Sequence, residues 1–353
     1  MGKINVDEQM MEYAVYGGAV LGGGGGGWIE DGLQLGRLAL EVGPLHLLTA
    51  DEMDEDATLL TTSIVGAPAA KDKHVKPIHC LRAMELLGES FKKPIDGIIV
   101  NENGANTTVN GWFQAAITGL PIIDLACNGR AHPTSIMGAM NLHELPEYIS
   151  HQAAAGGRGN QYLEVSVSAT IEQTSSLIRR VSVDAGGLVA VARNPVTVKY
   201  ARVNGAPGAI SQAIELGEAL LTHKGESAIE AVCSKLGGRV VAVGEVSEFA
   251  ITTDRGWDVG HVTIGDYELT FWNEYMTLEQ DGQRLATFPD LIMTLDARTA
   301  HPVVSAAITK GQAVAVIHVP RGQLILSTTM SNPTLLKPIE DVIGKSINSY
   351  IFK

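Results

Sequence analysis

The stretch IDGIIVNENG, residues 95–104, shows how the first part of this chain is built. Its apolar run is typical of a buried strand, and the polar residues after it mark a loop. Similar apolar runs occur at residues 44–50, 57–66 and 120–129. Stretches with helical periodicity separate them, at residues 77–91 and 105–118. Strand and helix therefore alternate from residue 44 to about 125, which predicts an α/β domain with a mostly parallel sheet covered by helices.

The rest of the chain divides into helical and strand-like parts. Helical patterns occur at residues 7–21, 29–42, 142–157, 169–182 and 208–223. From Gly237 onward the chain has short alternating runs, such as GHVTIG (260–265), separated by turns rich in glycine, aspartate and asparagine. Such runs are typical of an antiparallel β domain. We therefore expect an α/β domain over residues 1–165, and a helical segment followed by a β-rich domain over residues 166–353.

Composition narrows the class of partner. Acidic residues outnumber basic ones 39 to 26 among 353 residues, for a net charge of −13, and the basic residues are scattered. This balance disfavours nucleic acid and anionic membranes as partners and favours a small-molecule substrate. The N-terminus lacks a basic and apolar leader, no apolar run has the length of a membrane span, and three cysteines are a poor disulfide framework. We expect a cytoplasmic protein, and a homo-oligomer as is common among soluble enzymes.

Six consecutive glycines, Gly22–Gly27, lie between the first two predicted helices. Glycines in series indicate a backbone that takes positive φ or is approached closely, because each one costs conformational entropy on folding. A preceding helix and the lack of a following lysine with serine or threonine disfavour a nucleotide-binding loop. Two interpretations stay open: a tight connection without a ligand, or a loop whose N–H groups face a small anionic or carbonyl-bearing ligand. The second interpretation makes four residues candidates for substrate binding: Gly24, Gly25, Gly26 and Trp28.

Polar side chains gather after two neighbouring predicted strands. Glu102 and Asn106 follow one strand, and a second group follows the next: Asp124, Cys127, Asn128, Arg130 and His132. Ligands in open α/β sheets bind outside the carboxyl ends of the strands, so these side chains are expected to form a site. Their chemical types also ligate divalent metals, although the spacing matches no metal motif. The alternative is that Asp124 and Asn128 cap a turn and that Arg130 pairs with an acid.

A third cluster lies in KDKHVKPIHC, residues 71–80. It places His74, His79 and Cys80 within seven positions, at the start of a predicted helix. A single histidine is usually structural or exposed, but two beside a thiol fit a metal site as well as a structural role. In the C-terminal part, Asp290 follows a proline and can either cap a turn or complete a site across the domain interface.

Several ordered motifs together resemble a known family. They are GGAVLGGGGG (17–26), GAPAAKDK (66–73), NENGAN (101–106), LPIIDLACNGRAHP (120–133), FWNEYMTLEQDGQRLATFPDLIMTLD (271–296) and GQAVAVIHVP (311–320). Spread over nearly the whole chain, they resemble the S-methyl thiohydantoin desulfurase-like family, which also occurs beside or fused to hydantoinase- and oxoprolinase-type proteins. The resemblance implies a bilobed α/β protein with a β-rich C-terminal domain and chemistry on a five-membered thiohydantoin or related ring.

The resemblance also implies a reaction and a cofactor. Within the family the chain looks most similar to metal-dependent desulfhydrases of ergothioneine breakdown, which act on 3-(5-oxo-2-thioxoimidazolidin-4-yl)propionic acid. The expected reaction hydrolyses the ring C=S bond to C=O and releases hydrogen sulfide. A zinc, cobalt or manganese ion would polarise the C=S bond and activate a water molecule.

The chain departs from the family pattern mainly by added metal-ligand types: His132 stands where an aromatic residue is usual, and His74 and His79 are extra. The resulting hypothesis assigns four candidate metal ligands within residues 1–165: His74, His79, Asp124 and His132, with Cys127 in reserve. Glu102 is the expected general base, with Asp124 and Cys127 as further catalytic candidates. Arg130 is expected to hold the substrate carboxylate through two parallel hydrogen bonds. Two further residues are candidates for substrate binding: Asn106 and Asp290.

Two other functions stay open. A metal-free amidohydrolase would open a hydantoin or lactam ring, with Cys127 or Asp124 as nucleophile. A non-catalytic subunit of a hydantoinase would show no turnover alone and would expose a large apolar patch.

Overall fold

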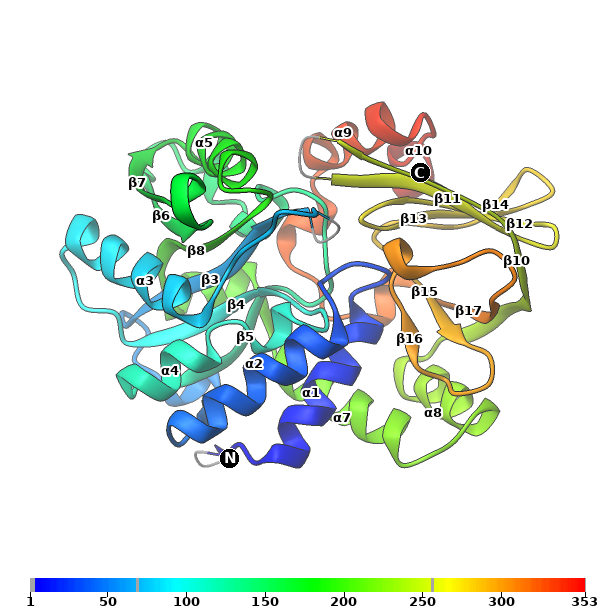
Figure 1. Cartoon of the computed structure of the whole chain (residues 1–353), viewed down its shortest axis with the longest axis horizontal. Helices are drawn as coiled ribbons and strands as arrows, with labels where there is room; N and C mark the ends of the chain where they lie inside the picture. Colours follow the sequence, from blue (N-terminus) through cyan, green and yellow to red (C-terminus); the bar gives the residue numbers. More distant parts are fainter. Residues whose placement is uncertain (1–3, 68–69, 255–256, 353) are drawn as a thin grey trace.

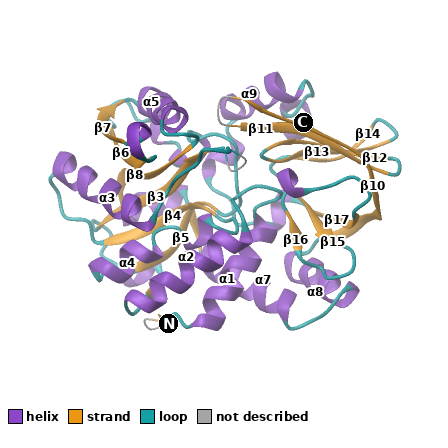
Figure 2. Cartoon of the chain, in the orientation of Figure 1, coloured by secondary structure: helices purple, strands orange, loops and turns teal. Residues whose placement is uncertain are grey.

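The computed structural model describes residues 4–67, 70–254 and 257–352 of the chain. They form two lobes, each built around its own β-sheet, and Figure 1 shows the two sheets side by side. Figure 2 shows that most of the helices belong to the first lobe or lie between the lobes. Within these residues no helix combines the length and the apolar character needed to cross a membrane.

The first sheet has a parallel centre. Its parallel strands lie in the order β2 (His46–Leu48), β5 (Ile122–Asn128), β4 (Gly97–Glu102) and β3 (Thr58–Gly66). Antiparallel strands extend it on both sides: β1 (Ile4–Asn5) beside β2, then β8 (Leu188–Thr197), β6 (Ser150–Gly156) and β7 (Leu163–Ala169) beyond β3. A short strand, β9 (Ala206–Pro207), pairs with β5. The carboxyl ends of β4 and β5 therefore lie next to each other, with Glu102 opposite Asn128.

Helices cover this sheet and connect its strands. They are α1 (Glu8–Leu21), α2 (Ile29–Val42), α3 (Pro77–Phe91), α4 (Trp112–Thr118), α5 (Ile171–Asp184), α6 (Val198–Asn204) and α7 (Ala209–Leu221). Asp7 caps α1 because its carboxylate accepts a hydrogen bond from the N–H of Met10 at 2.8 Å. α1 and α7 pack so closely that a Cβ on Gly17 would lie 1.8 Å from the carbonyl oxygen of Ala213. This close approach explains why the sequence places glycine inside α1.

The second lobe is antiparallel, with the strand order β14-β13-β12-β11-β10-β17-β15-β16. Its strands are β10 (Arg239–Asp254), β11 (Trp257–Ile264), β12 (Tyr267–Trp272), β13 (Glu274–Gln280), β14 (Gln283–Thr287), β15 (Leu291–Asp296), β16 (Pro302–Val303) and β17 (Ala313–Val319). Three helices accompany it: α8 (Glu226–Leu236), α9 (Pro333–Ile343) and α10 (Asn348–Ile351). Alternating apolar residues of the strands, such as Leu269, Phe271 and Leu278, pack in its core.

The expected fold class is confirmed: an α/β first lobe with parallel strands and helices precedes a β-rich second lobe. The prediction of a helix over residues 142–157 is wrong, because residues 150–156 form β6. The alanines of β6 favour helix in isolation, but they are fully buried between β7 and β8, and pairing overrides that preference. The proposed division at residue 165 falls inside β7, and β8 beyond it belongs to the first sheet.

Candidate functional site between the lobes

The lobes meet at a cavity of about 140 Å³. The first lobe lines it with the glycine loop after α1, with the ends of β3 and β4, and with parts of α5 and β8. The second lobe adds the turn before β13 and residues 304–306. Six of its polar lining residues form the chemical core of the site: Asn101, Glu102, His132, Arg179, Arg193 and Glu274. A cavity of about 150 Å³ is known to bind benzene, so a cavity of this size can hold a small ring.

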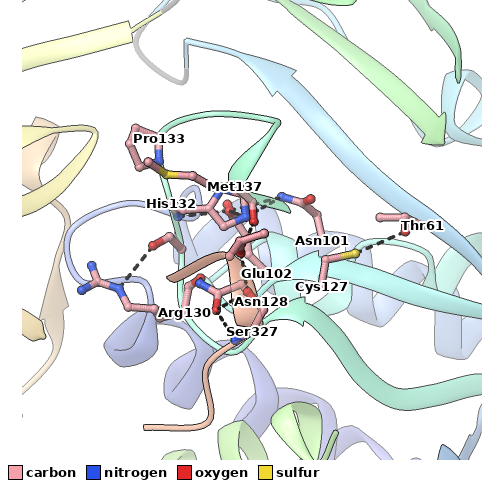
Figure 3. A network of polar contacts seen from close by, with 12 residues as sticks. Thr61, Asn101, Glu102, Cys127, Asn128, Arg130, His132, Pro133, Met137 and Ser327 are labelled. Carbon is pink, nitrogen blue, oxygen red and sulfur yellow. Dashed lines mark hydrogen bonds and ion pairs between the residues drawn. The ribbon is translucent and has the colours of Figure 1, made fainter. Parts of the chain in front are cut away.

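Glu102 is the last residue of β4 and lines the cavity at the strand end, as the sequence predicts. Its Oε2 accepts hydrogen bonds at 3.2 Å from the backbone N–H of His132 and at 3.2 Å from Nδ2 of Asn101. Nε2 of His132 also lies 3.2 Å from this oxygen. Figure 3 shows the three side chains converging on one point. The pairing of β4 with β5 explains the contact, since His132 lies in the loop that follows β5.

Burial changes the protonation of both groups. It raises the pKa of Glu102 to about 7, against the opposing hydrogen bond from His132 and the positive charge of Arg193. Burial, together with the charge of Arg193, lowers the pKa of His132 to about 3. His132 is therefore neutral at physiological pH, and a single proton can lie between its Nε2 and Glu102. A carboxyl group that titrates near neutrality is suited to act as a general base.

Arg193 of β8 supplies positive charge to the cavity. Its side chain is 1% exposed, and its Nη2 donates a hydrogen bond to Oδ1 of Asn101. Its Nε and Nη1 have no hydrogen-bond partner among the residues that the structure describes. Arg179 of α5 lines the same cavity and lies over the ring of Trp257, 4.5 Å from its centre. A buried guanidinium group that still has donors to offer, as Arg193 does, favours an anionic ligand.

Glu274, the first residue of β13, enters the cavity from the second lobe. The preceding residue, Asn273, takes a positive φ of 55° and closes a tight turn between β12 and β13. The Glu274 side chain is 2% exposed, and its Oε2 has no hydrogen-bond partner in the described part of the chain. Burial and the negative charge of Glu102 raise the pKa of Glu274 well above its usual value. With Asp258 of β11, three buried carboxyl groups line the cavity, and Glu102 and Glu274 do so from different lobes.

The glycine run joins α1 to α2, and Gly24–Gly27 line the cavity. The run also packs against the second lobe, because the carbonyl oxygen of Gly24 accepts a hydrogen bond from the N–H of Ser305 at 2.9 Å. A Cβ on Gly25 would lie 2.0 Å from Oε1 of Glu274. The glycines therefore allow a close approach of the lobes as well as of a ligand. All the substrate-binding candidates at this end of the cavity do line it: Gly24, Gly25, Gly26, Trp28 and Asn106.

Asp124 lies in a structural position. Its Oδ1 accepts hydrogen bonds from the N–H groups of Ile210 and Ser211, at 2.9 and 3.0 Å. These are free donors of the first turn of α7, whose own cap residue, Gly208, has no side chain to offer. Asp124 is not among the described residues that line the cavity. It therefore caps α7 from β5, in place of the catalytic or metal-ligating role predicted for it.

Cys127 is also turned away from the cavity. Its Sγ lies 3.3 Å from Oγ1 of Thr61, and Figure 3 shows the thiol directed toward that residue and away from Glu102. Burial raises the pKa of Cys127 to about 11, so the thiol is protonated at neutral pH. Cys127 is not a described lining residue of the cavity and its protonated thiol is a weak nucleophile, which argues against the catalytic role predicted for it.

Arg130 and Asp290 hold the two lobes together. Nη1 of Arg130 donates to the carbonyl oxygen of Pro289 at 3.2 Å and to that of Asp290. The Asp290 carboxylate accepts from the N–H of Arg321 at 2.9 Å and lies 3.0 Å from Nε2 of His318. Although burial opposes it, the hydrogen bonds from His318 and Arg321 hold the pKa of Asp290 below its usual value. Neither Arg130 nor Asp290 is a described lining residue, so both contact protein where substrate contact was expected.

The four predicted metal ligands do not meet. His79 lies in the first turn of α3, where its Nδ1 accepts a hydrogen bond from the N–H of Lys76 at 3.1 Å. The ring of His74 lies 6.0 Å from that of His79, and of the four only His132 is a described lining residue. Across residues 4–67, 70–254 and 257–352, no group of three His, Cys, Asp or Glu side chains is placed to hold a metal ion. The predicted set therefore does not fit one ion.

Three residues of the site were not predicted from the sequence: Arg193, Arg179 and Glu274. Arg193 had a readable signal, because an arginine interrupts the apolar run LVAVARNPVT of β8. Arg179 had none, since it is one of two adjacent arginines on an amphipathic helix. Glu274 stands at a strand end, but nothing in the sequence shows that this end meets the other lobe.

Comparisons with known proteins agree with this architecture. The N-terminal domain of the S-Me-THD-like family matches residues 9–165, and its C-terminal domain matches residues 169–330. An X-ray structure of a protein from Chromobacterium violaceum superposes with a TM-score of 0.73 over 96% of each chain, at 18% sequence identity. That likeness concerns the fold alone, and no curated protein matches the chain. Because the two family domains follow one another over nearly its full length, the chain belongs to the S-Me-THD-like family.

Proposed function

We propose that this protein hydrolyses the C=S bond of a thiohydantoin to C=O and releases hydrogen sulfide, with 3-(5-oxo-2-thioxoimidazolidin-4-yl)propionic acid as its substrate. The observation that supports this most is the buried Glu102, whose pKa is about 7, in a cavity between the lobes. Membership of the S-Me-THD-like family supports thiohydantoins as the substrate class. A cytoplasmic location and a homo-oligomer stay predictions.

Glu102 acts as the general base of this reaction. Water attacks C2 of the ring, and the Glu102 carboxylate takes one proton from that water. The hydrogen bonds from Asn101 and from the His132 N–H fix the orientation of the carboxylate before substrate binds. His132 stays neutral, so it forms no ion pair with the Glu102 carboxylate that would weaken it as a base.

The propionate of the substrate binds Arg193, with Arg179 adding positive charge. Nε and Nη1 of Arg193 each lack a described partner, so either can donate to one oxygen of a carboxylate, and both arginines line the cavity. This assignment replaces Arg130, whose Nη1 already donates to two carbonyl oxygens of the second lobe. The glycine loop and Trp28 form the wall beside the ring.

A divalent metal, implied by the resemblance, has no three-ligand group among the described residues. The steps above therefore use side chains only. Metal dependence is a separate question, which elemental analysis and chelation of the purified protein answer directly.

The test is a sulfide-release assay on purified protein with the thiohydantoin propionate, before and after chelation. We expect one hydrogen sulfide for each hydantoin propionate formed. Ring opening without sulfide would support the amidohydrolase alternative instead. Absence of any reaction in both metal-supplemented and chelated samples contradicts the proposed function.

A further inference from the structure

We infer that Glu274 is the general acid of the site, which protonates the departing sulfur from the second lobe. The inference rests on the proposed function and adds a catalytic residue to it. The carboxyl group must then touch the reacting atoms, so it has to be buried in the cavity and unengaged by protein.

The geometry meets both conditions at Oε2, although the backbone N–H of Glu274 itself hydrogen-bonds the carboxyl group. Glu274 lines the cavity, is 2% exposed, and has no described hydrogen-bond partner for Oε2. An orphaned buried carboxyl oxygen is costly in a folded protein and points to a partner supplied by a ligand. The backbone around it is built for this placement, because Asn273 turns the chain with a φ of 55° and Ser305 donates a hydrogen bond to the carbonyl oxygen of Asn273.

The glycine loop completes this placement from the first lobe. At Gly25 any side chain would collide with the Glu274 carboxyl, since a Cβ there would lie 2.0 Å from Oε1. The absence of a side chain at Gly25 therefore lets an acid of the second lobe reach a cavity lined largely by the first. No comparable contact would be needed if the loop only joined two helices.

Burial and the neighbouring Glu102 carboxylate favour the protonated form of Glu274, whereas the contacts of Glu102 favour its ionised form. Burial and the negative charge of Glu102 raise the pKa of Glu274, while the charges of Arg130 and Arg179 oppose this. Glu102 also receives a hydrogen bond from the His132 N–H and the charge of Arg193, which favour its carboxylate. Two carboxyl groups whose environments separate their proton affinities divide into a base and an acid.

The reaction balances with this pair. Water oxygen bonds to C2 and gives one proton to Glu102, the C=S π electrons move to sulfur, and Glu274 gives its proton to that sulfur. The C2–S bond then breaks, its electron pair leaves as hydrosulfide, and the new hydroxyl forms C=O by returning its proton to Glu274. Glu102 passes its proton to hydrosulfide, so the net change is C=S plus water to C=O plus hydrogen sulfide.

The experiment compares two ring derivatives of similar size, with ethylthio or 2,2,2-trifluoroethylthio at C2. The fluorinated thiol is more acidic, so it leaves with less help from an acid. We expect Glu274→Gln to lower kcat/KM for the ethylthio compound about a hundredfold or more, and clearly less for the fluorinated one. Glu102→Gln is the matched control and should lower both values by the same factor, because both reactions need the base.

The ratio of the two values within one preparation does not depend on how much of the variant is folded. An equal loss for the two compounds in Glu274→Gln, or no loss, overturns the inference while leaving the proposed function in place. If the wild-type protein hydrolyses neither of the two derivatives and does not hydrolyse the thiohydantoin, the proposed function itself is contradicted.

Discussion

Two pairs of buried or half-buried acidic side chains lie in different settings in this protein. The cavity carboxylates, Glu102 and Glu274, have raised pKa values, and Oε2 of Glu274 finds no partner among the described residues. The anchoring carboxylates, Asp124 and Asp290, each accept hydrogen bonds from backbone N–H groups, of α7 and of Arg321. Asp124 and Asp290 therefore hold elements together. In contrast, Glu274 has an unsatisfied oxygen and Glu102 keeps a raised pKa in spite of its hydrogen bonds, so these two are available to a ligand.

The largest effect is expected on activity, when a cavity carboxylate is replaced. Glu102→Gln removes the base but keeps the shape and a hydrogen-bond acceptor for the His132 N–H. We expect kcat to fall about a thousandfold in sulfide release. Thermal stability should be unchanged or higher, because an amide is easier to bury than a charge. A loss of activity below about tenfold shows that Glu102 is not the base.

The pH dependence of the wild type gives the next largest effect. The active form of Glu102 is the carboxylate, and its pKa is about 7, so kcat/KM should rise as the pH increases. Between pH 5.5 and pH 8 the rise should be about thirtyfold, with apparent values that belong to the Glu102 and Glu274 pair. A profile that is flat over this range contradicts the assignment of Glu102.

Asp124→Ala tests the anchoring setting. The change removes the acceptor for two N–H groups at the start of α7. We expect the free energy of unfolding in urea to fall by about 1 kcal/mol, as for other helix caps. The folded variant should keep its kcat/KM for sulfide release. A large loss of kcat/KM without loss of stability would restore Asp124 to the catalytic candidates.

Asp290→Asn should have the smallest effect. The folded pKa of Asp290 lies below the unfolded one, so its stabilisation is present above the unfolded pKa of about 3.9 and is lost as the pH falls through the folded value. We expect the variant to lose about 1 kcal/mol or less at pH 7 and clearly less at pH 3, where part of that stabilisation is already gone. Urea unfolding at the two pH values measures this difference. An equal loss of unfolding free energy at both pH values would mean that the charge of Asp290 contributes nothing to stability.

The sequence predicted the fold where local pattern and tertiary pairing agree. Residues 77–91 have helical periodicity and form α3, and the strand-end rule placed Glu102 and Asn106 at the cavity. The prediction from helical periodicity failed at β6, where pairing with β7 and β8 holds the alanines in a strand. The sequence pattern located the carboxyl ends of the strands, but it could not show which neighbouring groups form hydrogen bonds with each side chain.

Local sequence pattern is equally limited at the candidate site, because it does not show which distant groups contact a side chain. Asp124 and Glu102 look alike in sequence, since each lies in or after a buried strand. Only the structure shows that α7, which begins 85 residues after Asp124, provides the partners of one and not of the other. Glu274 reaches the cavity only because the second lobe packs on the glycine loop, a contact between distant parts of the chain.

The central claim is that the cavity between the lobes is the thiohydantoin site. A crystal structure of the protein with the hydantoin propionate product bound tests this most directly. We expect the ring in the cavity between Glu102 and Glu274, with one propionate oxygen on Nε or Nη1 of Arg193. A ring bound beside His74 and His79, or a propionate on Arg130, would contradict it.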